Sequence, residues 1–201
     1  MKKGKFAGKR IEGILGVCLL FVFLTGCGEV QLQTGTNLQL EKDGSVTVTY
    51  IEEFPSDYYD VSELEAMNKE EVALYNQEKG ENVVEVVSTE TDGSQLTLVM
   101  RYEDMEDYGD MNGLQVYHGT VEQAKALGYN LDHSFKDVKA GSVVTDMDWE
   151  ILAEHQVVIA NEPAAIHTYK NIVYVTENVT VSDSKKMATI TGEDMAVIVF
   201  K

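Results

Sequence analysis

The sequence predicts an α+β fold: an antiparallel β-sheet with two helices on one face and a β-rich meander in the C-terminal part. Three observations predict it. Asp-Gly pairs stand between runs in which apolar and polar residues alternate, capping patterns precede two helical segments, and short apolar segments separated by polar turns fill the chain after Gln156. Strands and helices grouped in this way are typical of sheets that carry their helices on one side.

Two hairpins are predicted in the first half of the chain. Residues 37–53 contain two alternating runs on either side of Asp43-Gly44. An Asp-Gly pair between such runs is typical of a tight hairpin turn. A continuous apolar strand at 83–87 is followed by Asp92-Gly93 and a further alternating run, which predicts the second hairpin.

Two helices are predicted from their capping patterns. Residues 62–65 match the S-x-x-E capping box ahead of a helix that ends at Gly80, and residues 120–123 match the related T-x-x-Q pattern ahead of a shorter helix that ends at Gly128. Helical spacing predicts that one side of the first helix is buried. That side holds Leu64, Met67, Leu74 and Tyr75.

The second half of the chain is predicted to be rich in strands. Residues 129–150 have no clear periodicity and are expected to form loop or partial helix, where a boundary within the domain would fall. The later strands form a meander that either completes the first sheet or makes a second, smaller one. The predicted strands are 157–159, 172–175, 179–181, 188–190 and 196–200.

The first 26 residues have the pattern of an export signal. Five basic residues lie among the first ten, and the uncharged stretch from Gly13 to Cys27 contains an apolar core at 14–24. A signal peptide needs an apolar region of about 7–15 residues, whereas a membrane-spanning helix needs about 18 or more. We therefore expect residues 1–26 to be a signal peptide. The alternative is an uncleaved anchor followed by an ordinary thiol.

The end of this segment reads Leu24-Thr25-Gly26-Cys27, which resembles the lipobox of bacterial lipoproteins. The resemblance implies that a dedicated signal peptidase recognises Leu24, Thr25 and Gly26 and that the Cys27 thiol receives a diacylglyceryl group. Acyl chains stabilise membrane attachment by about 0.8 kcal/mol per buried CH₂. Because no second hydrophobic span is seen, the lipid is expected to be the only anchor, on the extracytoplasmic face of the cell membrane.

The mature chain is predicted to have a lipidated tether at 27–36 and a single domain at 37–201. Residues 1–26 contain five of the 16 basic and one of the 34 acidic residues, so the remainder has 11 and 33 and a formal charge of −22. Such a charge repels phosphate backbones, which excludes nucleic acid as a partner. The only other cysteine is Cys18 in the signal, so we expect neither a disulfide nor a CxxC metal site.

Two parts of the domain resemble LppM-type lipoprotein domains. One is the first turn, Lys42-Asp43-Gly44-Ser45, and the other runs from Pro163 through Asn171-Ile172-Val173-Tyr174 to Asn178-Val179-Thr180-Val181. The resemblance covers strand signatures, so it implies an architecture and no catalytic chemistry.

The segment 103–113 contains the densest group of carboxylates. Aligning it with the calcium loop of an EF-hand would place Tyr108 first and Gly119 twelfth, and neither side chain is a ligand. A solvated acidic loop is therefore favoured, and neither a metal nor another cofactor is predicted. The weak calcium candidates are Asp104, Glu106, Asp107, Asp110 and Asn112.

Other candidate residues favour packing over chemistry. The four histidines lack the spacing of a zinc motif, and no nucleophile elbow, Walker loop or dinucleotide fingerprint is present. The ten tyrosines suggest stacking on glycans, but Tyr50, Tyr75 and Tyr102 fall in strand or helix patterns. Trp149 is expected to anchor a core.

These observations predict a non-enzymatic binding or interaction module of the cell envelope, held to the membrane by its N-terminal lipid and docking on another envelope protein or polymer. The alternative is a lipoprotein that binds a cation, a small ligand or a glycan. A hydrolase with an unrecognised site is the third hypothesis.

Overall fold

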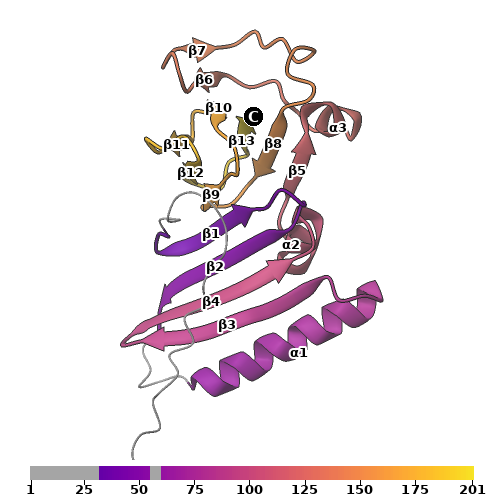
Figure 1. The fold of residues 1–201 in the computed structure, drawn as a ribbon, viewed down its shortest axis with the longest axis vertical. Coiled ribbons are helices and arrows are strands. Elements are labelled where there is room, and N and C mark those ends of the chain that lie inside the picture. Colours follow the sequence, from indigo (N-terminus) through magenta and orange to yellow (C-terminus); the bar gives the residue numbers. More distant parts are fainter. Residues whose placement is uncertain (1–31, 55–59) are drawn as a thin grey trace, which may run out of the picture.

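The computed structural model describes residues 32–54 and 60–201, which form three helices and thirteen strands (Figure 1). The predicted α+β class and the β-rich C-terminal part are confirmed. The export signal, with the lipobox residues Leu24, Thr25, Gly26 and Cys27, lies outside the described residues, and so do two of the ten tyrosines considered for glycan stacking, Tyr58 and Tyr59. Among the described helices, none has the length and apolar character needed to cross a membrane.

The first sheet has seven strands and contains both predicted hairpins. All neighbouring strands are antiparallel except β1 and β9, which run parallel. The order across the sheet is β11 (Val179–Val181), β12 (Met187–Ile190), β9 (Ala165–His167), β1 (Gly35–Leu40), β2 (Val46–Glu53), β4 (Gln95–Tyr102) and β3 (Val84–Asp92).

The second sheet has six strands and includes the segment 129–150, which forms two short strands and no helix. The sequence left open whether the C-terminal strands complete the first sheet or form a second one. They do both, because some of them join the first sheet and others build the second. The order across the second sheet is β5 (Val116–Thr120), β8 (Gln156–Ala160), β13 (Ala196–Phe200), β10 (Ile172–Thr176), β6 (Phe135–Asp137) and β7 (Val143–Val144).

The three helices are α1 (Val61–Lys79), α2 (Met105–Asn112) and α3 (Val121–Ala126). The capping box predicted at Thr120 and Gln123 is confirmed at the start of α3. The box predicted at Ser62 and Glu65 is wrong, because the N-cap of α1 is Asp60, whose carboxylate accepts hydrogen bonds from the Ser62 amide and hydroxyl. The acidic loop predicted at 103–113 is also wrong, since most of it forms α2.

The buried side of α1 agrees with the predicted one only in part, because Leu64 and Tyr75 are half-buried and Tyr75 packs against the core, but the other two residues are not buried. Met67 and Leu74 are 62% and 61% exposed, whereas Val72 is buried. The cause is Asn76, whose side chain accepts hydrogen bonds from the amides of Val83 and Val84 and donates to the Val84 carbonyl. These bonds turn Asn76 toward the sheet, together with Val72 and Asn68, which lie one and two turns earlier on the same side of the helix. Met67 and Leu74 are left on the opposite side.

Two cores hold the molecule together. The larger core joins the inner faces of the two sheets and also contains Val72 of α1 and Met105 and Tyr108 of α2. The smaller core lies on the other face of the six-stranded sheet, under α3, where Trp149 packs edge-on against Phe135. Of the two predicted helices, α1 therefore lies with α2 beside the seven-stranded sheet, while α3 covers the second sheet.

Candidate functional site: a cleft between two helices and the seven-stranded sheet

A cleft of about 180 Å³ lies where α1 and α2 meet the face of β2 and β4. Two features of the fold produce it. The inward side of α1 offers Asn68 where a large apolar residue would fill the space, and α2 is only eight residues long. The cleft is lined by Tyr50, Asn68, Glu71, Leu98, Met100, Tyr102, Met111 and Asn112.

Asn68 is the most unusual residue of the cleft wall. Its amide nitrogen is buried and has no hydrogen-bond partner among the described residues. A buried amide without a partner costs about 1–3 kcal/mol, and the great majority of buried polar groups are paired. Glu71 follows Asn68 by three residues, slightly less than one turn of α1, and is exposed at the same cleft. The Asn68 nitrogen is closed off from solvent, so the charged group that this wall offers to a ligand is the Glu71 carboxylate.

Three tyrosines surround the floor of the cleft. The rings of Tyr102 and Tyr108 meet edge to face with their centroids 5.2 Å apart, and Tyr50 lies beside them on β2. Burial raises the pKa of all three hydroxyls above the ordinary value of 10.0. The phenols therefore stay protonated at neutral pH and can donate as well as accept hydrogen bonds.

A short polar network fixes these tyrosines. The Tyr108 hydroxyl donates to the Glu162 carboxylate at 2.7 Å, and the Asn112 amide nitrogen donates to the Tyr102 hydroxyl at 3.3 Å and to the Tyr108 carbonyl at 2.8 Å. Burial raises the pKa of Glu162, while the hydrogen bond from Tyr108 acts in the opposite direction. The network links α2 to the chain just before β9 and holds the cleft floor rigid.

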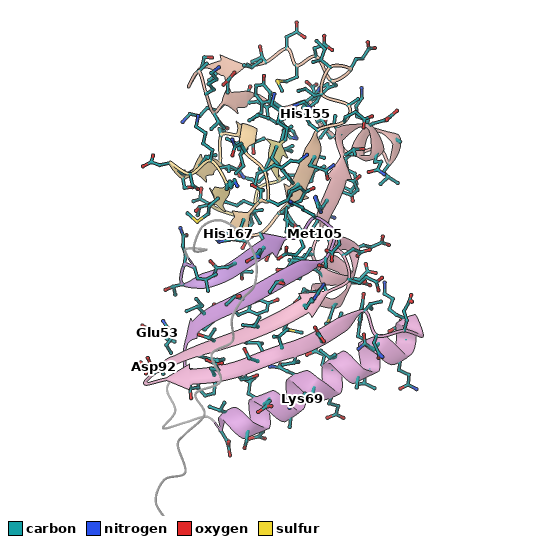
Figure 2. All side chains as sticks on the ribbon, viewed as in Figure 1. Glu53, Lys69, Asp92, Met105, His155 and His167 are labelled. Atoms are coloured by element: carbon teal, nitrogen blue, oxygen red, sulfur yellow. The ribbon has the colours of Figure 1, made fainter. Side chains whose placement is uncertain are left out.

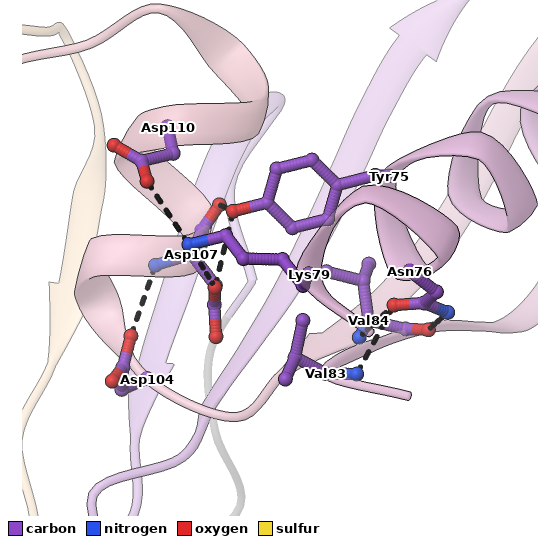
Figure 3. Close-up of polar contacts among 8 residues, drawn as sticks. All are labelled: Tyr75, Asn76, Lys79, Val83, Val84, Asp104, Asp107 and Asp110. Atoms are coloured by element: carbon purple, nitrogen blue, oxygen red, sulfur yellow. Dashed lines mark hydrogen bonds and ion pairs between the residues drawn. The ribbon is translucent and has the colours of Figure 1, made fainter. Parts of the chain in front are cut away.

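The carboxylates considered as calcium ligands serve α2 itself (Figure 3). Asp104 is the N-cap and accepts a hydrogen bond from the Asp107 amide at 2.9 Å. Asp107 is buried, 3.0 Å from the Lys79 ammonium, and also accepts from the Tyr75 hydroxyl. These contacts join the end of α1 to α2, which makes this group a structural connection beside the cleft.

Lys79 also approaches Asp110 at 3.1 Å, and its pKa is raised first by its hydrogen bond with Asp107. Burial, together with the Asp107 carboxylate, raises the pKa of Tyr75 to about 12. Glu106 is exposed, and Asn112 is the only one of the calcium candidates that lines the cleft. Within residues 32–54 and 60–201, no three His, Cys, Asp or Glu side chains are grouped as a metal site would require.

Two of the histidines, His155 and His167, lie in separate parts of the molecule (Figure 2). His118 stacks on Phe200 in the larger core with ring centroids 5.9 Å apart, and His167 is buried on β9. Burial lowers the pKa of both below the ordinary value of 6.5, and the Nε2 atom of each is buried without a partner in the described part of the chain. Both residues are therefore neutral elements of the packing.

Sequence reasoning missed most of the cleft. Asn112 was considered only as a calcium ligand, Tyr50 and Tyr102 were considered for stacking on glycans and then assigned to packing in strands, and neither Asn68 nor Glu162 was singled out. One signal was present, because Met105, Tyr108 and Met111 recur at intervals of three, which is compatible with a helix. The acidic residues between them concealed it.

Comparisons with protein families, with curated proteins and with solved structures gave no match to this chain.

Proposed function

We propose that this chain is an extracytoplasmic lipoprotein that binds an envelope component in the cleft between α1, α2 and the seven-stranded sheet, without converting it chemically. The observation that supports it is the cleft itself, where the exposed side chains of Glu71 and Asn112 stand beside the half-buried apolar side chains of Leu98 and Met111. A concave site with an apolar lining and a few polar groups is suited to binding a ligand.

The start of the domain supports a position close to the membrane. The Gln33 amide donates to the Asn37 side chain at 2.8 Å, and the same side chain donates to the Gln33 carbonyl, so the chain is held against the sheet from this residue onward. Gln33 is the sixth residue after Cys27, with five residues between the two. A chain of that length spans at most about 22 Å. A lipid on Cys27 would keep the domain within that reach of the bilayer.

The lipid anchor is tested by replacing Cys27 with Ser in the full chain. We expect the protein to move from the membrane fraction to the soluble fraction of lysed cells, and metabolic labelling with a palmitate analogue to be lost. A Cys18→Ser variant is the matched control, because this thiol lies within the signal and should leave both properties unchanged. Membrane retention of the Cys27→Ser protein would contradict the anchor.

Binding in the cleft is tested by photo-cross-linking in intact cells. A benzophenone amino acid at Met111, which lines the cleft, should capture an envelope component, whereas the same group at Ile151 should not. Ile151 is 75% exposed in the turn region between β7 and β8, so it controls for accessibility. Equal capture at both positions, or none at Met111, would contradict the proposal.

A second mode of interaction is favoured by the outward side of α1. Met67 and Leu74 are both largely exposed and lie seven residues apart, so they share one side of the helix. Exposed apolar side chains on a helix suit docking on another envelope protein. Capture from a benzophenone at Leu74, without capture at Met111, would favour this mode over binding in the cleft.

A further inference from the structure

We infer that a lysine patch beside the tether, formed by Lys170, Lys185 and Lys186, docks on anionic lipid headgroups of the membrane that holds the Cys27 lipid. The inference goes beyond binding in the cleft and rests on the lipid anchor of the proposed function. It follows from the way the fold gathers the three lysines, from their charge and from the place where the tether joins the domain.

Backbone contacts hold the three lysines together. Lys185 and Lys186 lie in the turn between β11 and β12, and Lys170 lies in the loop between β9 and β10. The Lys185 carbonyl accepts a hydrogen bond from the Ile172 amide at 2.7 Å, and the Lys186 carbonyl accepts one from the Thr168 amide at 2.8 Å. The turn and the loop are therefore joined on both sides of Lys170, and the three side chains start from one small area of the surface.

The backbone of Lys185 does not suit a lysine. Its φ is 59°, and among the described residues it is the only one other than glycine with a positive φ. The left-handed region favours glycine, because a Cβ is crowded there. The turn itself would be served better by glycine, so the presence of a lysine is explained by its charged side chain.

The charges of the patch are accessible and unpaired. Lys170 and Lys186 are exposed, and Lys185 is half-buried. The ion pairs found within residues 32–54 and 60–201 involve none of the three. Their ammonium groups are therefore available to a partner that approaches from solvent.

Further positive charge adjoins the patch. The Lys201 amide donates a hydrogen bond to the Asn171 carbonyl at 3.0 Å, which places Lys201 next to the loop that contains Lys170. Burial, followed by the charges of Lys201 and Lys170, lowers the pKa of His155. Both ammonium groups therefore act on the same small region.

The acidic charge of the domain does not cancel this local charge. Asp183, in the same turn, and Glu154, next to His155, offset part of it. Charges farther away than the Debye length, about 8–10 Å at physiological ionic strength, are largely screened. The formal charge of −22 therefore describes the domain as a whole, while a headgroup at the turn responds to the nearby lysines.

The tether joins the domain beside the patch. The Gln33 side chain reaches β12, where its amide nitrogen lies 4.0 Å from the Met187 sulfur and its amide oxygen accepts a hydrogen bond from the Thr189 hydroxyl at 3.5 Å. Met187 directly follows Lys186. Because a lipid on Cys27 stays within about 22 Å of Gln33, the bilayer surface is within reach of the patch.

The anchor explains why a small patch is sufficient. An ammonium group binds phosphate as a point charge, and each lysine near an anionic lipid surface favours attachment about fivefold. Three lysines bind weakly alone, but the lipid on Cys27 would hold them at a high effective concentration beside the headgroups. Docking would then fix which side of the domain faces the bilayer.

The test measures the reactivity of single lysines in the full lipidated chain, reconstituted in vesicles of phosphatidylcholine or of phosphatidylcholine mixed with phosphatidylglycerol. Trace acetylation followed by mass spectrometry gives a rate for each lysine. We expect Lys170, Lys185 and Lys186 to react at least about fivefold more slowly in the mixed vesicles. Lys69 should react equally in both, because it lies on α1, which packs beside β3 at the opposite edge of the first sheet.

Two variants and one control locate the docking. Lys185→Gly and Lys186→Gln should each remove most of the protection of Lys170. Glycine suits the left-handed backbone at 185, so the first variant removes a charge without disturbing the fold. Lys69→Gln removes the same charge from an exposed position on α1 and should leave the protection unchanged. In 1 M sodium chloride, where the Debye length falls to about 3 Å, the protection of the wild type should disappear.

The outcomes separate this inference from the lipid anchor. A protein that stays in the vesicles while its lysines react equally in both compositions would overturn the docking and leave the anchor. A protein that leaves vesicles of both compositions would overturn the anchor, and the docking with it. Protection of the patch by added polyglutamate, without protection by phosphatidylglycerol, would overturn the lipid and assign the patch to an acidic polypeptide.

Discussion

The six-stranded sheet is covered on both faces, whereas the seven-stranded sheet has a continuous core on its inner face only. From Val157 onward in β8 and throughout β13, successive residues enter the smaller and the larger core in turn, so all of these residues are apolar. Along β2 and β4, the alternate residues include Thr47, Val99 and Arg101, which are half-buried or exposed. The second sheet therefore has a core on each face, whereas the first sheet has the cleft on its inner face, beside its one core.

The largest effect that tests this difference is expected from Ile198→Ala. Ile198 is fully buried in the middle of the second sheet, so the variant should lose about 2–5 kcal/mol of unfolding free energy. Leu98→Ala, which shortens a half-buried side chain at the cleft, should cost about 1 kcal/mol. Urea unfolding of both variants gives the comparison, and similar losses would show that the two sheets are packed equally well.

An intermediate effect is expected from Gly109→Ala. A methyl group at this position of α2 would lie 2.7 Å from a Val116 methyl carbon and 3.1 Å from the Leu114 carbonyl oxygen. Because β5 cannot move away from β8 without disturbing the second sheet, we expect α2 to shift toward the cleft, at a cost of about 1–3 kcal/mol.

The measurement is a thermal melt of Gly109→Ala beside Glu106→Ala, an exposed position on the same helix. The alanine at 106 should leave the melting temperature within about 2 °C of the wild type. An unchanged melting temperature for Gly109→Ala would mean that α2 has free space behind it and that the cleft is not rigid.

The smallest expected effect is a dependence of folding stability on pH, to which one histidine from each sheet contributes. His118 and His167 have pKa values lowered by burial, so the unfolded chain takes up protons more readily than the folded one. Stability should therefore be fully present above the unfolded value near 6.5 and should fall as the pH drops through it. The urea midpoint should be lower at pH 5 than at pH 7.5.

Single replacements divide this effect between the sheets. His118→Phe keeps the ring stacked on Phe200, and His167→Gln keeps a polar side chain on β9; each should reduce the difference in urea midpoint between the two pH values. If the urea midpoint of the double variant depends on pH as strongly as that of the wild type, groups other than these two histidines cause the dependence. Glu162, whose raised pKa favours the folded state at acid pH, acts with the opposite sign.

Local signals predicted much of the fold. The turns at Asp43-Gly44 and Asp92-Gly93 lie between paired strands, and the Thr120–Gln123 box begins α3, because each depends on residues close in sequence. The strands at 179–181 and 196–200 agree with their predicted bounds.

Features set by tertiary contacts were not predictable in this way. The rotation of α1 depends on the hydrogen bonds of Asn76 with β3, and β9 is only three residues long. The cleft depends on the rotation of α1 and on α2, whose apolar period is interrupted by carboxylates. No sequence pattern marks Asn68 and Glu71, because they line the cleft only through the packing of α1 against the sheet. The lipobox and the anchor at Cys27 stay predictions.

The central place of β13 has a consequence for how the protein is made. This strand comes after all the other described strands and lies between β8 and β10, and its residues contribute to both cores. A nascent chain that has not yet reached residue 200 lacks the middle of its second sheet. We therefore expect the domain to remain unfolded until β13 has left the ribosome, and an export signal of the kind proposed above would act on a chain that is still unfolded.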